Sequence, residues 1–409
     1  MPASPPDPLP ASAGSRSWSL AAAISAVAVF GLGIGQFAPL LSLLLETSGI
    51  DPMLNGLNAA ITSVGIVLGP FLAPRGVRVL GVNRFLLLCF ALDIAAVLAL
   101  KLFDSLADWF VLRFALGLIG SNIFTASEAW INRLAGDAGR GRVLGLYAAL
   151  LAAGLGLGPL LLALTGVHGW TPFLVNAGIS ALAILPLLAA GATTLEFGGQ
   201  HTGLSTGLVM QAPLIFVTVA LFGLFEFALM TLLPVWGLHH GMDARAAAGT
   251  LSGVYLGAIA MQVPVGWLSD RLSRRAALRL CGAVGLAGAV LLIVLPLTGV
   301  ALFGLLFVWG GIVAAIYPVA LSMAGDHFPA GALVAVNAAV ISAYGLGSLA
   351  GPVLGGAAMD LWNPQGLPAV FGLVFAAFLL LTCLPTTTQP TTAQRRTAQR
   401  TTAQRTTEK

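Results

Sequence analysis

VPVGWLSDRLSRRAAL, residues 263–278, joins two long apolar segments and places Asp270, Arg271, Arg274 and Arg275 within six positions. Only 8% of the 409 residues are charged, so this local concentration of charge requires an explanation. The explanation depends on the apolar segments on either side. A helix that crosses a lipid bilayer needs about 20 mainly apolar residues, and both flanking segments reach that length.

The composition excludes a water-soluble globular protein. Hydrophobic residues make up 58% of the chain and its mean hydropathy is +0.95, whereas soluble domains carry about 25% charged residues. The formal charge of +4 is explained better by basic membrane-flanking loops than by nucleic-acid binding, because no basic patch alternates with aromatic residues. Cys89, Cys281 and Cys383 are far apart in sequence and predict neither a disulfide framework nor a metal site.

Polar clusters and Gly/Pro turns divide the chain into twelve apolar segments, which predict an all-α membrane protein. The predicted spans are residues 19–45, 53–73, 84–103, 107–131, 143–165, 171–191, 214–237, 246–268, 276–297, 300–324, 332–357 and 367–384. We expect a disordered N-terminus (1–18), six-helix halves at 19–192 and 214–384, a cytoplasmic linker (193–213) and a disordered tail (385–409).

Basic residues predict the orientation. With a cytoplasmic N-terminus, sixteen of the nineteen Lys and Arg residues fall on the cytoplasmic side, whereas only Lys101 and Arg245 fall outside and Arg113 lies within a span. This asymmetry follows the positive-inside rule. Both termini are therefore predicted to be cytoplasmic, in a multi-pass protein of the bacterial inner membrane.

The two predicted halves repeat each other. Span five ends its GLGLGP segment in Gly158–Pro159, and span eleven ends GSLAGP in Gly351–Pro352, 193 positions later. Gly158, Pro159, Gly351 and Pro352 are predicted to serve as hinge or packing positions. Parallel repeats of six helices are typical of one large class of transporters.

The stretch GWLSDRLSRR closely resembles the cytoplasmic-loop signature G-x-L-x-D-R-x-x-R-R of the major facilitator superfamily. Span four resembles that superfamily's fourth-helix motif, because RFALGLIG begins with Arg113 and continues in a Gly-rich run. The resemblance extends over nearly the whole chain. It implies a twelve-helix secondary transporter with two six-helix repeats.

The same resemblance implies a conformational latch in GWLSDRLSRR, residues 266–275, which is called the charged loop below. Asp270 is expected at the start of span nine, where its carboxylate would accept from free amide groups. The alternative is plain topogenic charge, which explains the arginines but not the motif spacing. The first-half copy departs from the pattern, with Arg78 and Pro74 in the positions of Asp270 and Gly266. The predicted latch residues are Gly266, Asp270, Arg271, Arg274, Arg275 and Glu128.

Ionisable residues within spans are costly and mark functional sites by default. Glu226, in the middle of FGLFEFALM, predicts a proton site or a contact for a cationic group, with a structural hydrogen bond as the alternative. Arg113 either binds a carboxylate or phosphate of the solute or neutralises Asp93. Glu128 lies near Arg133, which favours an ion pair that locks the loop over contact with the solute.

Weaker candidates for the central cavity are polar or aromatic residues for which packing is an equal alternative: Gln36, Asn122, Trp309 and Tyr317. His239–His240 falls in an outer loop and is interpreted as solvated, because no third metal ligand is apparent. The sequence contains neither a phosphate-binding loop nor a G-x-S-x-G motif, so no enzymatic activity and no cofactor are predicted.

These features predict a monomeric secondary transporter that moves a small organic solute by alternating access, coupled to protons. Efflux and uptake of a nutrient or vitamin both fit the sequence. A receptor or structural protein that keeps the fold without transport is the alternative, and a membrane enzyme is the weaker one. The predicted partners are the solute, protons and the lipid bilayer, without nucleic acid.

Overall fold

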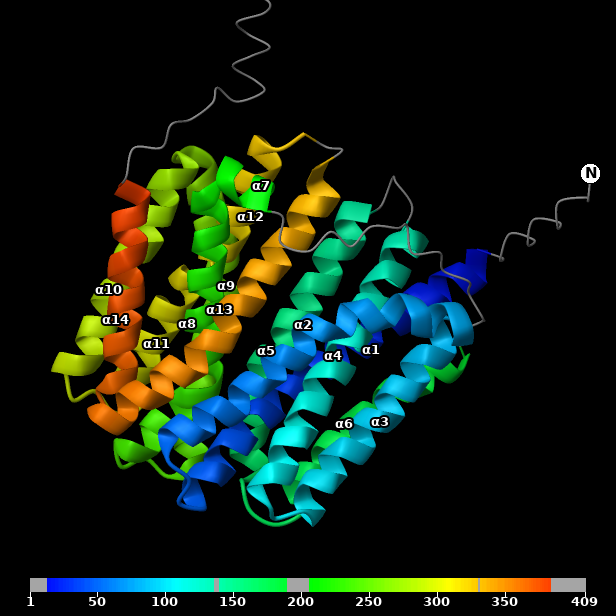
Figure 1. Ribbon diagram of the computed structural model, residues 1–409, viewed down its shortest axis with the longest axis horizontal. Helices are drawn as coiled ribbons and strands as arrows, with labels where there is room; N and C mark the ends of the chain where they lie inside the picture. Colours follow the sequence, from blue (N-terminus) through cyan, green and yellow to red (C-terminus); the bar gives the residue numbers. More distant parts are fainter. Residues whose placement is uncertain (1–12, 136–139, 190–205, 330–331, 384–409) are drawn as a thin grey trace, which may run out of the picture. The chain divides into compact units, whose positions relative to one another are not determined.

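The computed structural model describes residues 13–135, 140–189, 206–329 and 332–383, and within these ranges all regular secondary structure is helical (Figure 1). The helices are α1 (Ala13–Thr47), α2 (Pro52–Leu80), α3 (Val82–Leu102), α4 (Leu106–Ala135), α5 (Arg140–Thr165), α6 (Thr171–Ala189), α7 (Thr206–Gln211), α8 (Pro213–His239), α9 (Ala244–Arg271), α10 (Arg274–Val294), α11 (Gly299–Val313), α12 (Ile316–His327), α13 (Leu333–Leu361) and α14 (Gly366–Cys383).

The predicted all-α membrane fold is confirmed. In the described residues, eleven helical segments are long and apolar enough to cross a membrane, and Ala149–Thr165 within α5 is a shorter apolar helix. These segments correspond one to one with the twelve predicted spans. The predicted disorder of the N-terminus and of the 385–409 tail falls on residues that lie mostly outside the described ranges.

The tenth predicted span consists of two helices rather than one. α11 ends at Val313 and α12 begins at Ile316, although the apolar sequence continues without interruption. Pro318 explains the break, because proline has no amide hydrogen to bond the carbonyl of Ala314, four residues earlier. Hydropathy alone does not record this effect.

The described chain forms two compact units. Unit 1 comprises Met1–Phe37, Gly65–Leu161 and His168–Gly198, and unit 2 comprises Ala38–Val64, Leu162–Val167 and Gly199–Lys409. The second half of α1 and the first half of α2 therefore belong to unit 2. The predicted division into six-helix halves at residues 193–213 stays a prediction.

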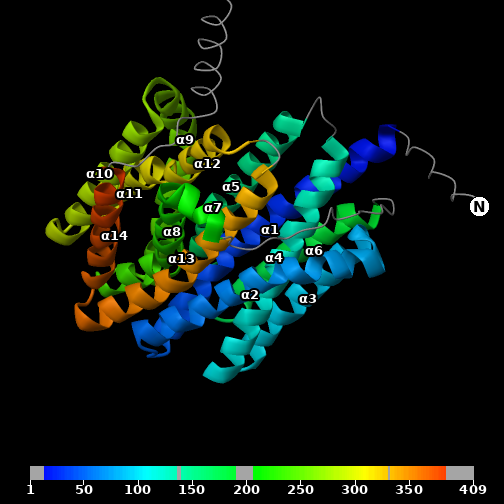
Figure 2. The ribbon, with the colours of Figure 1, turned by 45° about the horizontal axis from the view of Figure 1, so that its top comes forward.

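In unit 1, α3 packs against α4 and α6, and the three run side by side in Figures 1 and 2. The ring of Phe30 on α1 contacts Phe90 on α3 and Phe124 on α4, with centroid separations of 6.1 and 5.5 Å. Gly158 on α5 packs against the backbone of α1 at Gly35, where a Cβ atom would collide. The Gly158–Pro159 position is thus a site of close helix packing.

In unit 2, α8 and α13 lie side by side and in close contact (Figures 1 and 2). Gly347 and Gly351 stand one turn apart on α13, and a Cβ atom on either would collide with a carbonyl oxygen of α8, at Ala220 or Leu224. Small residues at this spacing let two membrane helices approach backbone to backbone. Gly351–Pro352 therefore belongs to a packing contact.

Polar residues join the ends of four helices within unit 2. His239, the last residue of α8, bonds through Nε2 to Glu46 of α1 at 2.5 Å and through Nδ1 to the side-chain amide of Asn363 at 2.6 Å. Asp360 near the end of α13 accepts from the backbone amide of Met53 on α2 at 3.2 Å. The interpretation of His239 as solvated is wrong, because both ring nitrogens have protein partners.

Replacement of Gly347 by alanine should lower stability, since the new methyl group meets the carbonyl of Ala220. Overpacking of this kind costs about 1–3 kcal/mol. Gly304 on α11 is the matched control, because nothing lies within 4 Å of its Cβ position. There, alanine should leave stability unchanged or raise it by up to about 1 kcal/mol. Thermal unfolding in detergent measures both, and equal shifts for the two variants would contradict the packing argument.

The Glu46–His239 pair should be energetically coupled. The two side chains are 14% and 24% exposed, and coupling between contacting residues reaches about 0.5–3 kcal/mol. A double-mutant cycle with Glu46→Gln and His239→Ala, followed by thermal unfolding, measures this coupling. The Arg274–Asp326 pair is more exposed, at 31% and 63%, and should give a smaller coupling of about 0.2–1 kcal/mol. Additive effects at Glu46 and His239 would contradict the prediction.

Candidate functional site

Glu226 is the acidic residue that stands within the apolar interior of α8. The sequence of unit 2 has no Lys or Arg before Arg245, none between Arg245 and Arg271, and none from 280 to 383. The basic residues of this unit's helices therefore stand at helix ends. Glu226 is half-buried, and its carboxylate accepts a hydrogen bond from the Tyr344 hydroxyl at 2.9 Å. The carboxylate has no basic partner among the residues described for unit 2.

Two of the chain's four tyrosines interact with this carboxylate, and a third packs against one of them. Besides Tyr344 on α13, Tyr255 on α9 lies close enough to Glu226 to interact with it electrostatically. The ring of Tyr317 on α12 meets the ring of Tyr344 edge to face, with 6.0 Å between centroids. Tyr344 also interacts electrostatically with Tyr255 and Tyr317. Glu226, Tyr255, Tyr317 and Tyr344 are called the tyrosine–carboxylate cluster below.

The glycine contact between α8 and α13 sets the position of Tyr344. A Cβ atom on Gly223 would lie 2.5 Å from the Tyr344 carbonyl oxygen and 3.1 Å from its ring carbon Cδ2. Residues three apart on a helix face the same side, so the space left by Gly223 stands beside Glu226. The missing side chain lets the tyrosine ring lie against α8 with its hydroxyl at the carboxylate.

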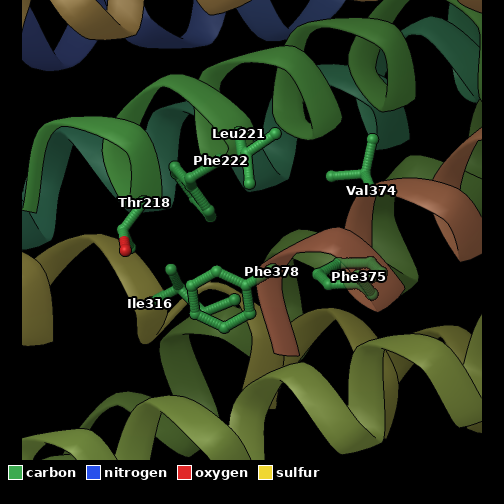
Figure 3. A pocket seen from close by; sticks show the side chains of 7 residues that line it. All are labelled: Thr218, Leu221, Phe222, Ile316, Val374, Phe375 and Phe378. Carbon is green, nitrogen blue, oxygen red and sulfur yellow. The ribbon is translucent and has the colours of Figure 1, made fainter. Parts of the chain in front are cut away.

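A small apolar pocket lies beside α8 (Figure 3). Phe222 lines the pocket, and its ring lies 5.8 Å from the ring of Tyr317. Thr218 also lines it, and its buried hydroxyl has no hydrogen-bond partner among the described residues. The pocket is lined by Thr218, Leu221, Phe222, Ile316, Val374, Phe375 and Phe378.

Trp309 belongs to the core of unit 2 and not to the cluster. Its side chain is 1% exposed, and its indole N–H donates to the Gly285 carbonyl at 2.9 Å. Its ring packs against Phe225, Phe371 and Phe375. These contacts favour packing, the alternative that the sequence left open.

In unit 1, Arg113 on α4 is 3% exposed, and its Nε and Nη2 atoms have no hydrogen-bond partner among the described residues. Asp93 on α3 instead accepts from the Ser180 hydroxyl of α6 at 2.7 Å. The alternative in which Arg113 neutralises Asp93 is therefore wrong for this structure. A buried guanidinium with free donors is suited to bind an anionic group.

Gln36 and Asn122 are buried in unit 1. The Gln36 amide donates to the Pro172 carbonyl at 3.0 Å, and its oxygen accepts from Asn176 at 3.2 Å, which ties α1 to α6. Asn122 donates to the Leu118 carbonyl of its own helix at 2.8 Å. For Gln36 the interhelical hydrogen bond is thus the better of the two sequence interpretations.

The charged loop differs from expectation at Asp270. α9 continues to Arg271, so Asp270 lies in its last turn, and Ser273 caps α10 by accepting from the amide of Ala276 at 3.2 Å. The prediction that Asp270 begins the next helix and caps it is therefore wrong. A hydroxyl one residue before the first turn of α10 is better placed to accept from the free amide groups. The Asp270 side chain lies outside the described residues.

The other predicted latch residues lie on or beside this loop, with the exception of Glu128. The Arg271 guanidinium stacks over the ring of Trp267 at 3.7 Å. Arg274 donates to the Ser269 hydroxyl at 3.0 Å and reaches the Asp326 carboxylate at 3.5 Å. Arg274 thereby ties the loop to the end of α12.

The remaining latch candidates differ in exposure. Arg275 is half-buried, and Gly266 is exposed with open space around its Cβ position. Glu128 is exposed on α4 in unit 1, and the side chain of Arg133, its predicted partner, lies outside the described residues.

Sequence reasoning missed Tyr255, Tyr344 and Ser180. The tyrosines could have been recognised from the sequence, because only four occur in the chain and three of them fall in the middle of apolar segments of the second half. Ser180 could not, since serine is common in membrane helices. Its role depends on the contact between α3 and α6.

Comparisons with known proteins agree with this architecture. The sequence model of the Major Facilitator Superfamily matches residues 21–255 and 215–407. The Bacillus subtilis protein YfkF, described as an uncharacterized MFS-type transporter, is 27% identical over 347 residues, covering 83% of this chain and 88% of YfkF. YcaD of Escherichia fergusonii, with the same description, is 26% identical over 365 residues, covering 88% and 93%.

A solved structure shows the same fold. A variant of the nucleoside transporter NupG matches with a TM-score of 0.75 at 13% identity, covering 89% of this chain and 98% of NupG. At this identity the likeness concerns the fold alone. The family match over nearly the whole chain, which agrees with the twelve apolar segments and the charged-loop motif, shows that the chain belongs to the Major Facilitator Superfamily, a family of membrane transporters and not of enzymes.

Proposed function

We propose that this transporter moves a small organic solute by alternating access and couples that movement to protons through Glu226. The observation that carries the proposal is a carboxylate inside a membrane helix whose partner is a tyrosine hydroxyl, with no basic partner among the residues described for unit 2. A charge in the bilayer interior costs at least about 2.5–3.5 kcal/mol. The carboxylate therefore favours a state in which a proton or a cation neutralises it.

Tyr344 suits both states of this carboxylate. Its hydroxyl donates to the ionised form at 2.9 Å, and the same oxygen can accept from the protonated form. The hydrogen bond thus supports gain and loss of the proton without a large rearrangement. In alternating access, the carboxylate gains its proton on one side of the membrane and loses it on the other.

In unit 1, we assign Arg113 to contact with an anionic group of the solute. The free donors on its guanidinium and its burial support this role. Asp93 is a second candidate for a proton site, because its carboxylate is buried and its hydrogen-bond partner, the Ser180 hydroxyl, is uncharged. Asn122, whose side-chain oxygen has no described partner, is assigned to solute contact.

We assign the loop between α9 and α10 to the conformational step of transport. Arg274 contacts both Ser269 and Asp326, so the loop ties α9 to the end of α12, and Arg271 is held against Trp267. Loss of these contacts would free the cytoplasmic ends of the helices. Gly351–Pro352 and Gly158–Pro159 mark the packing contacts around which such helices can pivot.

Glu226→Gln should abolish accumulation of solute driven by a pH gradient, because glutamine mimics the neutral carboxyl and cannot release a proton. Exchange of solute without a gradient should persist. Full-length protein in proteoliposomes, supplied with a solute found by thermal-shift screening, measures both. Glu226→Asp should keep partial coupling, since it shortens the side chain by one methylene group.

Asp104→Asn is the matched control for this experiment. Asp104 is an exposed carboxylate between α3 and α4, outside the membrane helices, and its replacement should leave gradient-driven accumulation unchanged. If Glu226→Gln still concentrates solute against its gradient under a proton gradient alone, Glu226 is not the coupling group. Asp93→Asn is then the variant that tests the second candidate.

The proposed orientation places both termini in the cytoplasm of a bacterial cell, with the protein in the inner membrane. It rests on the sixteen basic residues of the predicted cytoplasmic segments against two in the outer loops. Reporter tags after Lys409 and within residues 193–212 should read out as cytoplasmic. A tag within residues 239–243 should read out as periplasmic, and a periplasmic signal from the C-terminal tag would contradict the orientation.

A further inference from the structure

We propose that the tyrosine–carboxylate cluster of unit 2 binds an organic cation, and that the cation carries an apolar group which packs against the aromatic rings of the cluster. This inference rests on the proposed function, since it assigns a class of solute to the same carboxylate. Its residues are Glu226, Tyr255, Tyr317, Tyr344 and Phe222.

The first argument is the sign of the charge. Glu226 carries the one carboxylate within the interior of α8, and the basic residues of the helices described for unit 2 stand near helix ends. An anionic solute would meet repulsion here, with no basic side chain of these helices beside the carboxylate to offset it. A cationic solute would supply a counter-charge that the described part of unit 2 does not provide.

The second argument is the chemistry of the surrounding side chains. Aromatic faces attract cations, with about 0.5–1 kcal/mol at exposed sites and about 2 kcal/mol or more where water is excluded. The rings of Tyr317 and Tyr344 meet edge to face with 6.0 Å between their centroids, and the ring centroid of Phe222 lies 5.8 Å from that of Tyr317. Tyr317 and Tyr344 are half-buried, so part of each side chain stays open to a solute.

The third argument is the order of residues along α8. Thr218, Phe222 and Glu226 are spaced four residues apart, which places them on one face of the helix at intervals of about 6 Å. Thr218 and Phe222 line the apolar pocket, as Figure 3 shows, whereas Glu226 bonds to Tyr344. A solute with a cationic head at Glu226 therefore meets Phe222, one helical turn away, as the nearest apolar side chain on this face of α8.

Binding of radiolabelled benzyltrimethylammonium tests the inference. This probe combines a permanent positive charge with an aromatic ring, and equilibrium dialysis against full-length protein in detergent measures its Kd. Glu226→Gln should weaken binding at least about tenfold, because the charge attraction is lost. Tyr317→Leu should weaken it about two- to fivefold through loss of one aromatic face, and Tyr317→Phe should restore most of that loss.

Tyr147→Leu is the matched control, because Tyr147 is the one tyrosine that lies in unit 1, and its Kd should equal that of the parent protein. Neutral benzyl alcohol and anionic phenylacetate should not displace the probe. Gel filtration and thermal unfolding verify that each variant is folded, and the Tyr317 variants test the site even if Glu226→Gln does not fold.

Three results would overturn the inference: no binding to the parent protein, equal binding to folded Glu226→Gln, or displacement by benzyl alcohol as effective as by the unlabelled cation. None of these measurements uses a proton gradient. Failure of cation binding with gradient-driven accumulation intact would therefore reject the solute class and leave proton coupling in place. Cation binding together with gradient-driven accumulation by Glu226→Gln would reject proton coupling at Glu226 and leave the solute class in place.

Discussion

The lipid bilayer offers no water to polar groups, and this constraint governs the structure at every level. It requires backbone amides to pair within helices, and it directs buried side chains to partners on neighbouring helices. The Gln36 amide bonds to the Pro172 carbonyl, the Trp309 indole to the Gly285 carbonyl, and Asp93 to Ser180. Two charged groups differ from these: within the described residues, the Nε and Nη2 atoms of the buried Arg113 have no hydrogen-bond partner, and Glu226 has a tyrosine hydroxyl as its partner.

Close packing of backbones places the groups at the tyrosine–carboxylate cluster. Gly223, Gly347 and Gly351 bring α8 and α13 into contact, and Tyr344 thereby reaches Glu226. Without a hydrophobic driving force between helices in lipid, small residues supply close van der Waals contact instead. The same contacts that stabilise unit 2 thus orient the Glu226 carboxylate on α8.

The charged loop combines orientation with local structure. Its arginines follow the positive-inside rule, yet Arg271 and Arg274 also have defined contacts with Trp267, Ser269 and Asp326. Asp270 lies near the end of α9, and the cap of α10 is Ser273. The motif match therefore identified the family correctly, whereas the capping role inferred for its aspartate did not follow. A motif fixes spacing along the chain, but the residue at which a helix ends depends on local hydrogen bonds.

The amino-acid sequence by itself determined the class of fold, the positions of the apolar segments, the family and the identity of Glu226 and Arg113 as unusual residues. These follow from composition and from order along the chain, because bilayer thickness acts on each segment separately. Tertiary structure alone decided that Tyr255 and Tyr344 approach Glu226 and that Tyr317 packs against Tyr344. It also decided that Asp93 bonds to Ser180 and not to Arg113, and that His239 is paired with Glu46 and Asn363. Each of these contacts joins helices that are distant in sequence. Their choice depends on which helix faces lie together, and hydropathy does not encode the rotation of one helix against another.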